Sequence, residues 1–236
     1  MSTALLTAAS AVLLGLGACG ASRADSAALA EATTARETVA ALPSSVRVEP
    51  DTTLSVAYLA GGCFWCTEAS FERIAGVQAV VSGYSGGDAD DATYKKVAAG
   101  LTDHAEAIAV YYDSTAVSYR TLLDVFFVAH DPTTLNRQGP DVGRQYRSAI
   151  FYRGPREQVL AQAVIDSVNA AGRYGEPIVT EVVPFEAFYD AEDYHQDYLA
   201  DPSNPNQGYV QNVSWPKVRK VVKEFKARGL IKEEYL

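Results

Sequence analysis

From Leu54 onward, short apolar segments with strand character alternate with helical segments, and this alternation constrains the fold of the 236-residue chain more than any other feature. Such alternation is typical of an α/β arrangement in which helical crossovers connect the strands of one sheet. The patterns predict strands over residues 54–60, 77–83, 105–112, 148–152 and 178–183. They predict helices over residues 64–74, 119–129 and 155–170, the last beginning at a proline. About five strands and one core fit the length of the chain.

The residues before this region have a different character. Residues 5–18 are apolar and uncharged, which is typical of the core of a secretory signal, and they are too short to span a bilayer. Residues 16–19, Leu-Gly-Ala-Cys, resemble a bacterial lipobox, so we expect a signal over 1–19 and a lipid-anchored Cys19 on the periplasmic side of the bacterial cell envelope. The alternative is an ordinary cleaved signal with an incidental cysteine. Residues 20–50 contain no aromatic residue and predict a flexible linker.

The body of the chain and its C-terminal tail differ in net charge. The chain has a formal net charge of −9, which argues against a nucleic-acid-binding protein. Residues 216–236 nevertheless carry seven Lys and Arg against three Glu, with Val218, Val221, Val222 and Phe225 at helical spacing. This tail predicts an amphipathic helix that docks on the body, which comprises residues 51–215, and exposes a basic face to solvent; a membrane-contacting helix is the alternative.

The chain contains three cysteines, Cys19, Cys63 and Cys66, too few for a disulfide framework or a four-cysteine zinc site. Two glycines precede Cys63, between a predicted strand and a predicted helix. At a helix N-terminus the free N–H groups and the helix dipole favour a thiolate, so we expect a lowered pKa for Cys63. Cys66 follows one helical turn later, close enough for the two sulfurs to exchange a disulfide.

The same cysteine pair could instead be half of a zinc site, two inert buried thiols, or a structural disulfide. No metal is expected, because His104, His130 and His195 are scattered singly along the chain. An exported setting disfavours idle thiols, which leaves redox or nucleophilic chemistry as the favoured function.

The aromatic residues Phe64 and Trp65 lie directly beside Cys63. They could form a pocket for a methyl or thioether group, because sulfur contacts aromatic rings favourably. The alternative is that both side chains simply belong to the core.

Five ordered blocks of the sequence resemble the A-type peptide methionine sulfoxide reductase family. They are Gly-Cys-Phe-Trp-Cys-Thr-Glu-Ala at 62–69, Thr-Tyr-Lys-Lys-Val-Ala-Ala-Gly at 93–100, Asp-His-Ala-Glu-Ala at 103–107, the run from His130 to Ser148, and Ala-Glu-Asp-Tyr-His-Gln-Asp-Tyr at 191–198. The resemblance covers about residues 54–215. Asp103 stands where the family more often has Gly, and no cysteine follows Cys66, although many relatives carry resolving cysteines near the C-terminus.

The resemblance implies that Cys63 attacks the sulfur of methionine sulfoxide while a protonated Glu106 donates a proton to the oxygen. Glu106 also lies at the start of an apolar strand, where burial would raise its pKa and keep it neutral. The expected substrates are the S epimers of free and protein-bound methionine sulfoxide. Neither a metal nor a cofactor is implied, and we expect a monomer.

The resemblance also assigns the neighbours of this pair. Tyr94 and Tyr146 match phenols that donate hydrogen bonds to the sulfoxide oxygen. Asp141 matches a carboxylate that positions the site, and Phe64 and Trp65 match the pocket for the substrate methyl group. His195 has no clear chemical duty and is left as a structural residue. The implied fold is a two-layer α/β plait with a ferredoxin-like βαβ core, a mixed sheet and long coil on the C-terminal side.

Recycling is the last implication of the resemblance. The sulfenic acid formed on Cys63 would condense with Cys66, and a thioredoxin-like protein would reduce the Cys63–Cys66 disulfide. The rival is a one-cysteine cycle reduced directly by an external thiol. Two other functions stay open: a thioredoxin-like disulfide oxidoreductase that uses Cys63-Phe-Trp-Cys66, and a binding lipoprotein in which this pair forms a structural bridge.

Overall fold

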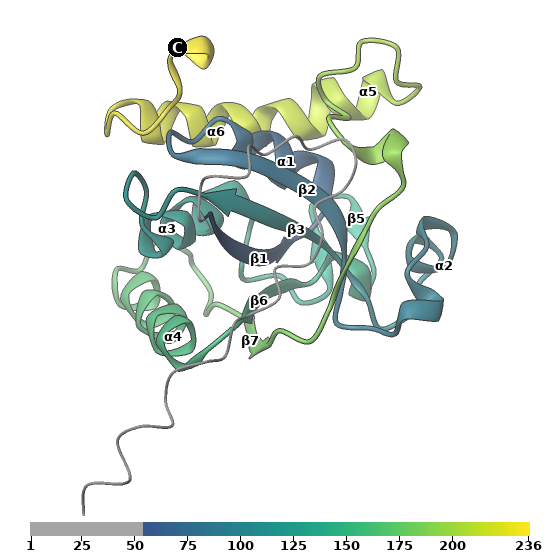
Figure 1. The fold of residues 1–236 in the computed structure, drawn as a ribbon, viewed down its shortest axis with the longest axis horizontal. Helices are drawn as coiled ribbons and strands as arrows, with labels where there is room; N and C mark the ends of the chain where they lie inside the picture. Colours follow the sequence, from purple (N-terminus) through teal and green to yellow (C-terminus); the bar gives the residue numbers. More distant parts are fainter. Residues whose placement is uncertain (1–53) are drawn as a thin grey trace, which may run out of the picture. The chain divides into compact units, whose positions relative to one another are not determined.

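One six-stranded sheet organises residues 54–236, the part of the chain that the computed structural model describes (Figure 1). The strand order is β7-β6-β1-β3-β2-β8, and the sheet is mixed because β6 and β7 run parallel whereas every other neighbouring pair is antiparallel. The strands are β1 (Ser55–Gly61), β2 (Val77–Ser85), β3 (Ala105–Tyr112), β6 (Ser148–Tyr152), β7 (Glu181–Pro184) and β8 (Phe188–Asp190). A separate hairpin pairs β4 (Arg137–Gln138) with β5 (Asp141–Val142).

Three helices make the crossovers between strands that run in the same direction. Helix α1 (Phe64–Glu72) joins β1 to β2 with β3 between them, and α3 (Tyr119–Ala129) joins β3 to β6 with β1 between them. Helix α4 (Pro155–Ala170) joins the adjacent parallel strands β6 and β7. The first two units are split βαβ motifs, so the predicted crossovers and the ferredoxin-like core are confirmed.

Both faces of the sheet are buried. On one face, Leu59, Ile108 and Ile150 pack with side chains of α1 and α3 in the main core. On the other face, a smaller cluster is covered by the coil between β7 and β8, where Phe185 stacks on Tyr58 with ring centroids 3.9 Å apart. Burial on both faces explains why the strands read as nearly continuous apolar runs, which made them recognisable in the sequence.

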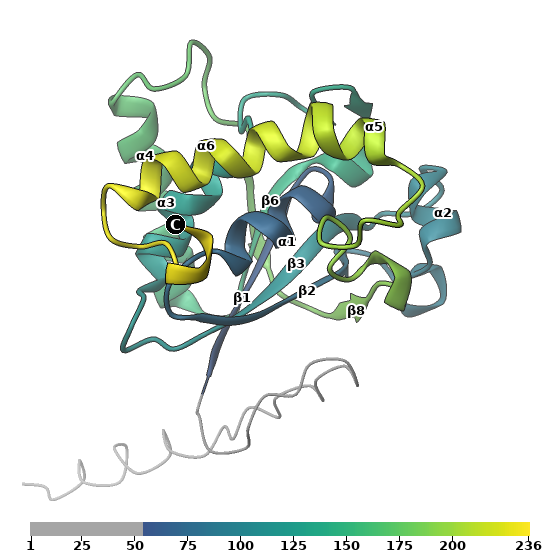
Figure 2. The ribbon, with the colours of Figure 1, turned by 90° about the horizontal axis from the view of Figure 1, so that it is seen from above.

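The C-terminal helix α6 (Trp215–Lys226) packs against α1 and α3, as Figure 2 shows. Val218, Val221 and Phe225 are buried, so the predicted docking of an amphipathic helix on the body is confirmed. The helix is shorter than the predicted 216–236, because the chain turns at Gly229, whose φ is +66°, before Ile231 pairs with Ile74.

The remaining elements are short, and most of them lie in irregular segments. Neither helix α2 (Tyr94–Ala98) nor strand β8 was predicted, and β7 begins three residues later than expected. Two short helices are α2 (Tyr94–Ala98) and α5 (Gln207–Tyr209), and a π-helical segment η4 (Val210–Ser214) leads into α6. The 3-10 helices are η1 (Ala89–Asp91), η2 (Arg144–Tyr146), η3 (Asp193–His195) and η5 (Glu233–Tyr235).

The signal, the lipobox with Cys19 and the whole linker predicted from the sequence lie outside the described residues. Within residues 54–236, no helix is both long enough and apolar enough to cross a bilayer.

Candidate active site

The turn between β1 and α1 places Cys63 at the N-terminus of the helix. Gly62 has a φ of +84°, a conformation that L side chains rarely adopt, and a Cβ at this position would collide with the Gln138 side chain. Cys63 follows as the N-cap residue of α1, and its carbonyl accepts the N–H of Cys66 at 3.1 Å. The glycine therefore allows the chain to carry the thiol into the site without displacing the loop behind it.

Glu106 reaches the same helix end from β3. Its Oε2 accepts the backbone N–H of Phe64 at 3.1 Å, and the side chain is buried. Burial raises the pKa of Glu106 to about 8, although the Phe64 N–H opposes the rise. The carboxyl group is therefore protonated at neutral pH, as its place in an apolar strand predicted.

The lowered pKa expected for Cys63 is wrong for the free protein. Burial, the hydrogen bond with the Cys66 thiol and the proximity of Glu106 raise the pKa of Cys63 well above its usual value. Burial is the largest cause, and the N–H of Phe64 at the start of α1 donates to the carboxyl group of Glu106. The sulfur therefore lies in an apolar setting without a charge partner, which favours the thiol.

The pKa of Cys66 is lowered, whereas that of Cys63 is raised. The hydrogen bond with the Cys63 thiol lowers the pKa of Cys66 to about 7, while burial opposes this change. The Cys66 thiol also donates a hydrogen bond to the Ser214 hydroxyl at 3.3 Å. The two sulfurs are hydrogen-bonded to each other, so they lie close enough for thiol exchange.

A pocket of about 210 Å³ opens beside Cys63. The structure brings together there seven of the residues predicted from the sequence, with Cys66 just behind them, and adds two residues that were not predicted. The lining residues are Cys63, Phe64, Trp65, Tyr94, Glu106, Asp141, Tyr146, Asn206 and Tyr209. Residues 54–236 contain no group of three or more His, Cys, Asp or Glu side chains that could hold a metal ion.

Two phenols face the thiol and the carboxyl group across the pocket. Tyr94 begins α2, where its backbone N–H donates to Glu192 at 2.9 Å, and Tyr146 ends η2. Burial raises the pKa of Tyr94 to about 12 and raises that of Tyr146 further. Both hydroxyls therefore stay protonated and can donate hydrogen bonds to an oxygen in the pocket.

Aromatic rings form the apolar wall. Trp65 stacks on Tyr198 with ring centroids 3.8 Å apart, and its indole N–H donates to Nδ1 of His195 at 3.0 Å. Burial lowers the pKa of His195 to about 4, so the ring is neutral at pH 7 and can accept this bond. His195, to which the sequence assigned no chemical duty, thus orients the indole that lines the pocket.

Tyr209 and Asn206 are the lining residues that no sequence pattern predicted. The Tyr209 hydroxyl donates to Oδ2 of Asp141 at 2.6 Å and lies within hydrogen-bond reach of the Cys63 thiol. Asn206 donates to the Tyr198 hydroxyl at 2.7 Å. Both come from the irregular C-terminal segment, where no periodicity marks a site; an aromatic residue within the polar run 201–209 was the one available signal.

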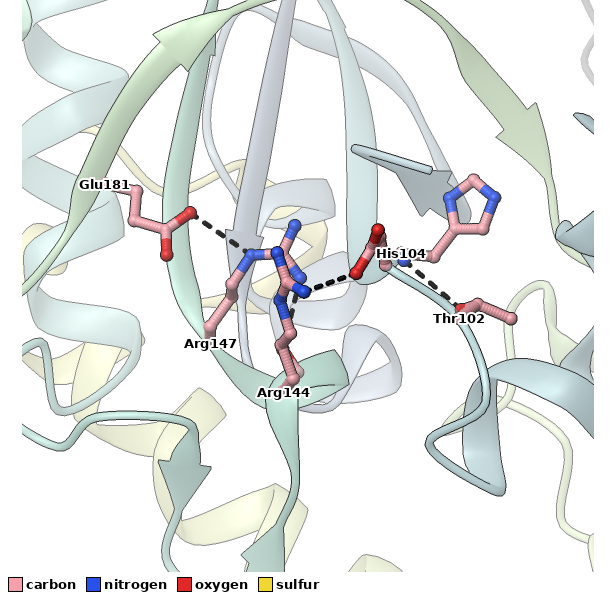
Figure 3. Close-up of polar contacts among 6 residues, drawn as sticks. Thr102, His104, Arg144, Arg147 and Glu181 are labelled. Atoms are coloured by element: carbon pink, nitrogen blue, oxygen red, sulfur yellow. Dashed lines mark hydrogen bonds and ion pairs between the residues drawn. The ribbon is translucent and has the colours of Figure 1, made fainter. Parts of the chain in front are cut away.

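An ion pair between Asp103 and Arg144 connects the segments that carry Glu106 and Tyr146 (Figure 3). Next to it, Arg147 donates to Glu181 at 3.3 Å and to the carbonyl of Arg144 at 3.2 Å. Asp103, which departs from the pattern of the family, thus has a definite partner. The pair is exposed, so we expect it to contribute less than about 1 kcal/mol to stability.

A model of the family described as "Peptide methionine sulfoxide reductase" matches residues 55–229. The chain belongs to the peptide methionine sulfoxide reductase family. Peptide methionine sulfoxide reductase MsrA of Natronomonas pharaonis is 49% identical over 171 residues, which cover 72% of this chain and 95% of that protein. The MsrA 1 protein of Rhodopirellula baltica is 51% identical over 170 residues, covering 72% of this chain and 86% of that protein.

Solved structures agree with this peptide methionine sulfoxide reductase assignment. Mxr1 from Saccharomyces cerevisiae in reduced form superposes with a TM-score of 0.61 and 35% identity, covering 68% of this chain and 92% of that chain. Methionine sulfoxide reductase A of Corynebacterium diphtheriae gives a TM-score of 0.58 and 33% identity, covering 67% of this chain and 81% of that chain.

Proposed function

We propose that the chain reduces the S epimer of methionine sulfoxide, free or within oxidised proteins, to methionine. One observation carries the mechanism: a buried, protonated Glu106 lies beside the Cys63 thiol in a pocket with an aromatic wall. A carboxyl group whose pKa is raised to about 8 can give up a proton at neutral pH, and the pocket also offers neutral phenols to a sulfoxide oxygen.

In the first step the Cys63 sulfur attacks the sulfoxide sulfur, and the S–O bond of the substrate breaks. Glu106 protonates the departing oxygen and takes up the proton of the thiol. The oxygen then bonds to Cys63 as a hydroxyl group while the new bond between the two sulfurs breaks, which leaves a sulfenic acid on Cys63. Methionine leaves reduced, and Cys63 is oxidised by two electrons. Tyr94 and Tyr146 donate hydrogen bonds to the oxygen, and Phe64 and Trp65 surround the methyl group.

In the second step the Cys66 sulfur attacks the Cys63 sulfenic acid, a disulfide forms, and water leaves. A thioredoxin-like protein then reduces the disulfide. The contact between the two thiols supports this order over a one-cysteine cycle.

A single-turnover assay without reductant tests both steps. We expect one methionine per protein from the S epimer, none from the R epimer, and loss of both thiols by mass spectrometry. Cys63→Ser should form no methionine. Cys66→Ser should form methionine once and keep a sulfenic acid that dimedone traps.

Different results would point to the alternatives. Methionine formation by Cys63→Ser would contradict the assigned nucleophile, and a Cys66 thiol that survives turnover would favour the one-cysteine cycle. Reduction of a model disulfide without reduction of methionine sulfoxide would instead identify a disulfide oxidoreductase.

The cellular setting is a separate part of the proposal. Export and lipid anchoring through Cys19 rest on the lipobox-like sequence, so the reductase would work at the bacterial cell envelope. We also expect the protein to act as a monomer. Mass spectrometry of the mature N-terminus should find a diacylglyceryl group on Cys19; an unmodified terminus elsewhere would contradict the anchor.

A further inference from the structure

Lys217 on α6 has a buried ammonium group that the chemistry described above does not use. Its Nζ atom is shielded from solvent and has no hydrogen-bond partner among the described residues. Burial of an ammonium group without a partner destabilises the fold, because the group loses its hydration and gains no hydrogen bond in return. The positive charge of Lys217 is therefore a candidate to interact with a negatively charged group that forms only during the reaction.

The candidate partner is Cys66. Helix α6 packs on α1, and Ser214, which lies three residues before Lys217, accepts the hydrogen bond from the Cys66 thiol. The positive charge of Lys217 lowers the pKa of Cys66, in addition to the larger effect of Cys63 and against the effect of burial. The negative charge of Asp141 on β5 acts in the opposite direction.

Other titratable groups around Cys66 do not supply a positive charge. Glu106 on β3 and Tyr209 on α5 are both affected by the charge of Cys66, and burial keeps both protonated at neutral pH. His130, at the end of α3, has a pKa lowered to about 4 by burial and is neutral. Lys220 also acts on His130, but its side chain is exposed. Lys217 is thus the buried cation that acts on the second thiol.

We propose that Lys217 is a positioning residue for the resolving step, whose buried ammonium group stabilises Cys66 as a thiolate. The inference rests on the proposed role of Cys66. In the thiolate state Ser214 can reverse its hydrogen bond and donate its hydroxyl proton to the sulfur. The thiolate then attacks the sulfur of the Cys63 sulfenic acid, the S–O bond breaks, and the hydroxide leaves as water with a proton from Glu106. Solvent returns to Glu106 the proton that Cys66 had released.

The variant Lys217→Met tests this proposal, because it removes the charge and keeps the length of the side chain. Reduced protein is mixed with one equivalent of methionine sulfoxide, quenched at set times, and analysed for methionine, sulfenic acid and disulfide in the same sample. Conversion of sulfenic acid to disulfide should slow about fivefold at pH 7, and the midpoint of its pH profile should rise by about one to two units. The rates should converge at alkaline pH, where the thiol ionises without help.

Matched variants separate this electrostatic role from a structural one. Lys217→Arg keeps the charge and should keep the midpoint, and Lys220→Met removes an exposed charge from the same helix and should change nothing. Lys217→Met should melt at the same or a higher temperature, since it removes a buried unpaired charge. Should it fail to fold, Lys217→Gln provides the same comparison with a second neutral side chain.

An unchanged pH profile in the neutral variant, or a midpoint shifted equally by Lys217→Arg, would overturn the proposal. Absence of a Cys63–Cys66 disulfide in the unsubstituted protein would overturn it together with the recycling step, while methionine would still form. Absence of methionine would instead contradict the proposed function itself.

Discussion

Glu106→Gln is expected to slow methionine formation by about 10²- to 10⁴-fold, the usual contribution of a positioned proton donor. Glutamine can still accept the N–H of Phe64 and fill the same space, but it has no proton to give to the departing oxygen. The measurement is the rate of the single turnover between pH 6 and 9. The rate of the unsubstituted protein should fall as the pH rises through about 8, where Glu106 ionises. The rate of the variant should show no such fall. A variant with nearly full activity would exclude Glu106 as the donor.

The same substitution should stabilise the protein at neutral pH. The pKa of Glu106 is raised from 4.5 to about 8 on folding, so its ionised form is disfavoured in the folded state. Its contribution to stability is fully present below pH 4.5 and is lost as the pH rises towards 8. Urea unfolding should find Glu106→Gln more stable than the unsubstituted protein by about 3 kcal/mol at pH 7, and close to it at pH 4. Equal pH profiles would show that this carboxyl group is not buried as described.

Gly62→Ala is expected to damage both the fold and the position of Cys63. The new Cβ would meet Cβ and Cγ of Gln138, and the residue would have to keep a φ of +84°. Overpacking and backbone strain together should cost about 3 kcal/mol of unfolding free energy. Displacement of Cys63 by about 1 Å should also slow methionine formation about 10²-fold. Thermal melting and the single-turnover rate measure the two effects.

Gly172→Ala is the matched control, because it measures the cost of backbone strain at a positive φ without a contact like the one with Gln138. Gly172 also has a positive φ, +61°, but nothing lies within 4 Å of a Cβ built there, and it is distant in sequence from the pocket residues. Strain alone should cost about 1 kcal/mol and leave the rate unchanged. If the two variants were equally stable and equally active, contact with Gln138 would have no part in positioning Cys63.

The fold could be predicted from the sequence wherever an element has a strong pattern of its own. Residues 105–112, 119–129, 148–152 and 155–170 form elements with the predicted bounds, because each is a long apolar or amphipathic run with clear ends. Helix α2 and strand β8 were not predicted, since a few residues carry no periodicity. Strand β7 starts late because it pairs with β6 only from Glu181 onward, which depends on the tertiary structure.

The site could be predicted only in part. The motif residues lie together as expected, although their roles stay predictions. The pKa expected for Cys63 was wrong because burial of the thiol, which depends on the tertiary structure, raises it, and because the Phe64 N–H donates to Glu106, which is far away in the sequence. Tyr209 was missed for a related reason: its place beside Cys63 follows from the path of the C-terminal coil, which no local pattern describes.

The span of the pocket along the chain has a consequence for synthesis. Its lining runs from Cys63 to Tyr209, and ribosomes add roughly 5–20 residues per second, so Cys63 is made about 7–30 s before Tyr209. During that interval the burial that suppresses ionisation of Cys63 is incomplete, because part of the pocket wall has not yet been made. The chemical setting of Cys63 is therefore complete only when the C-terminal coil has folded over the pocket.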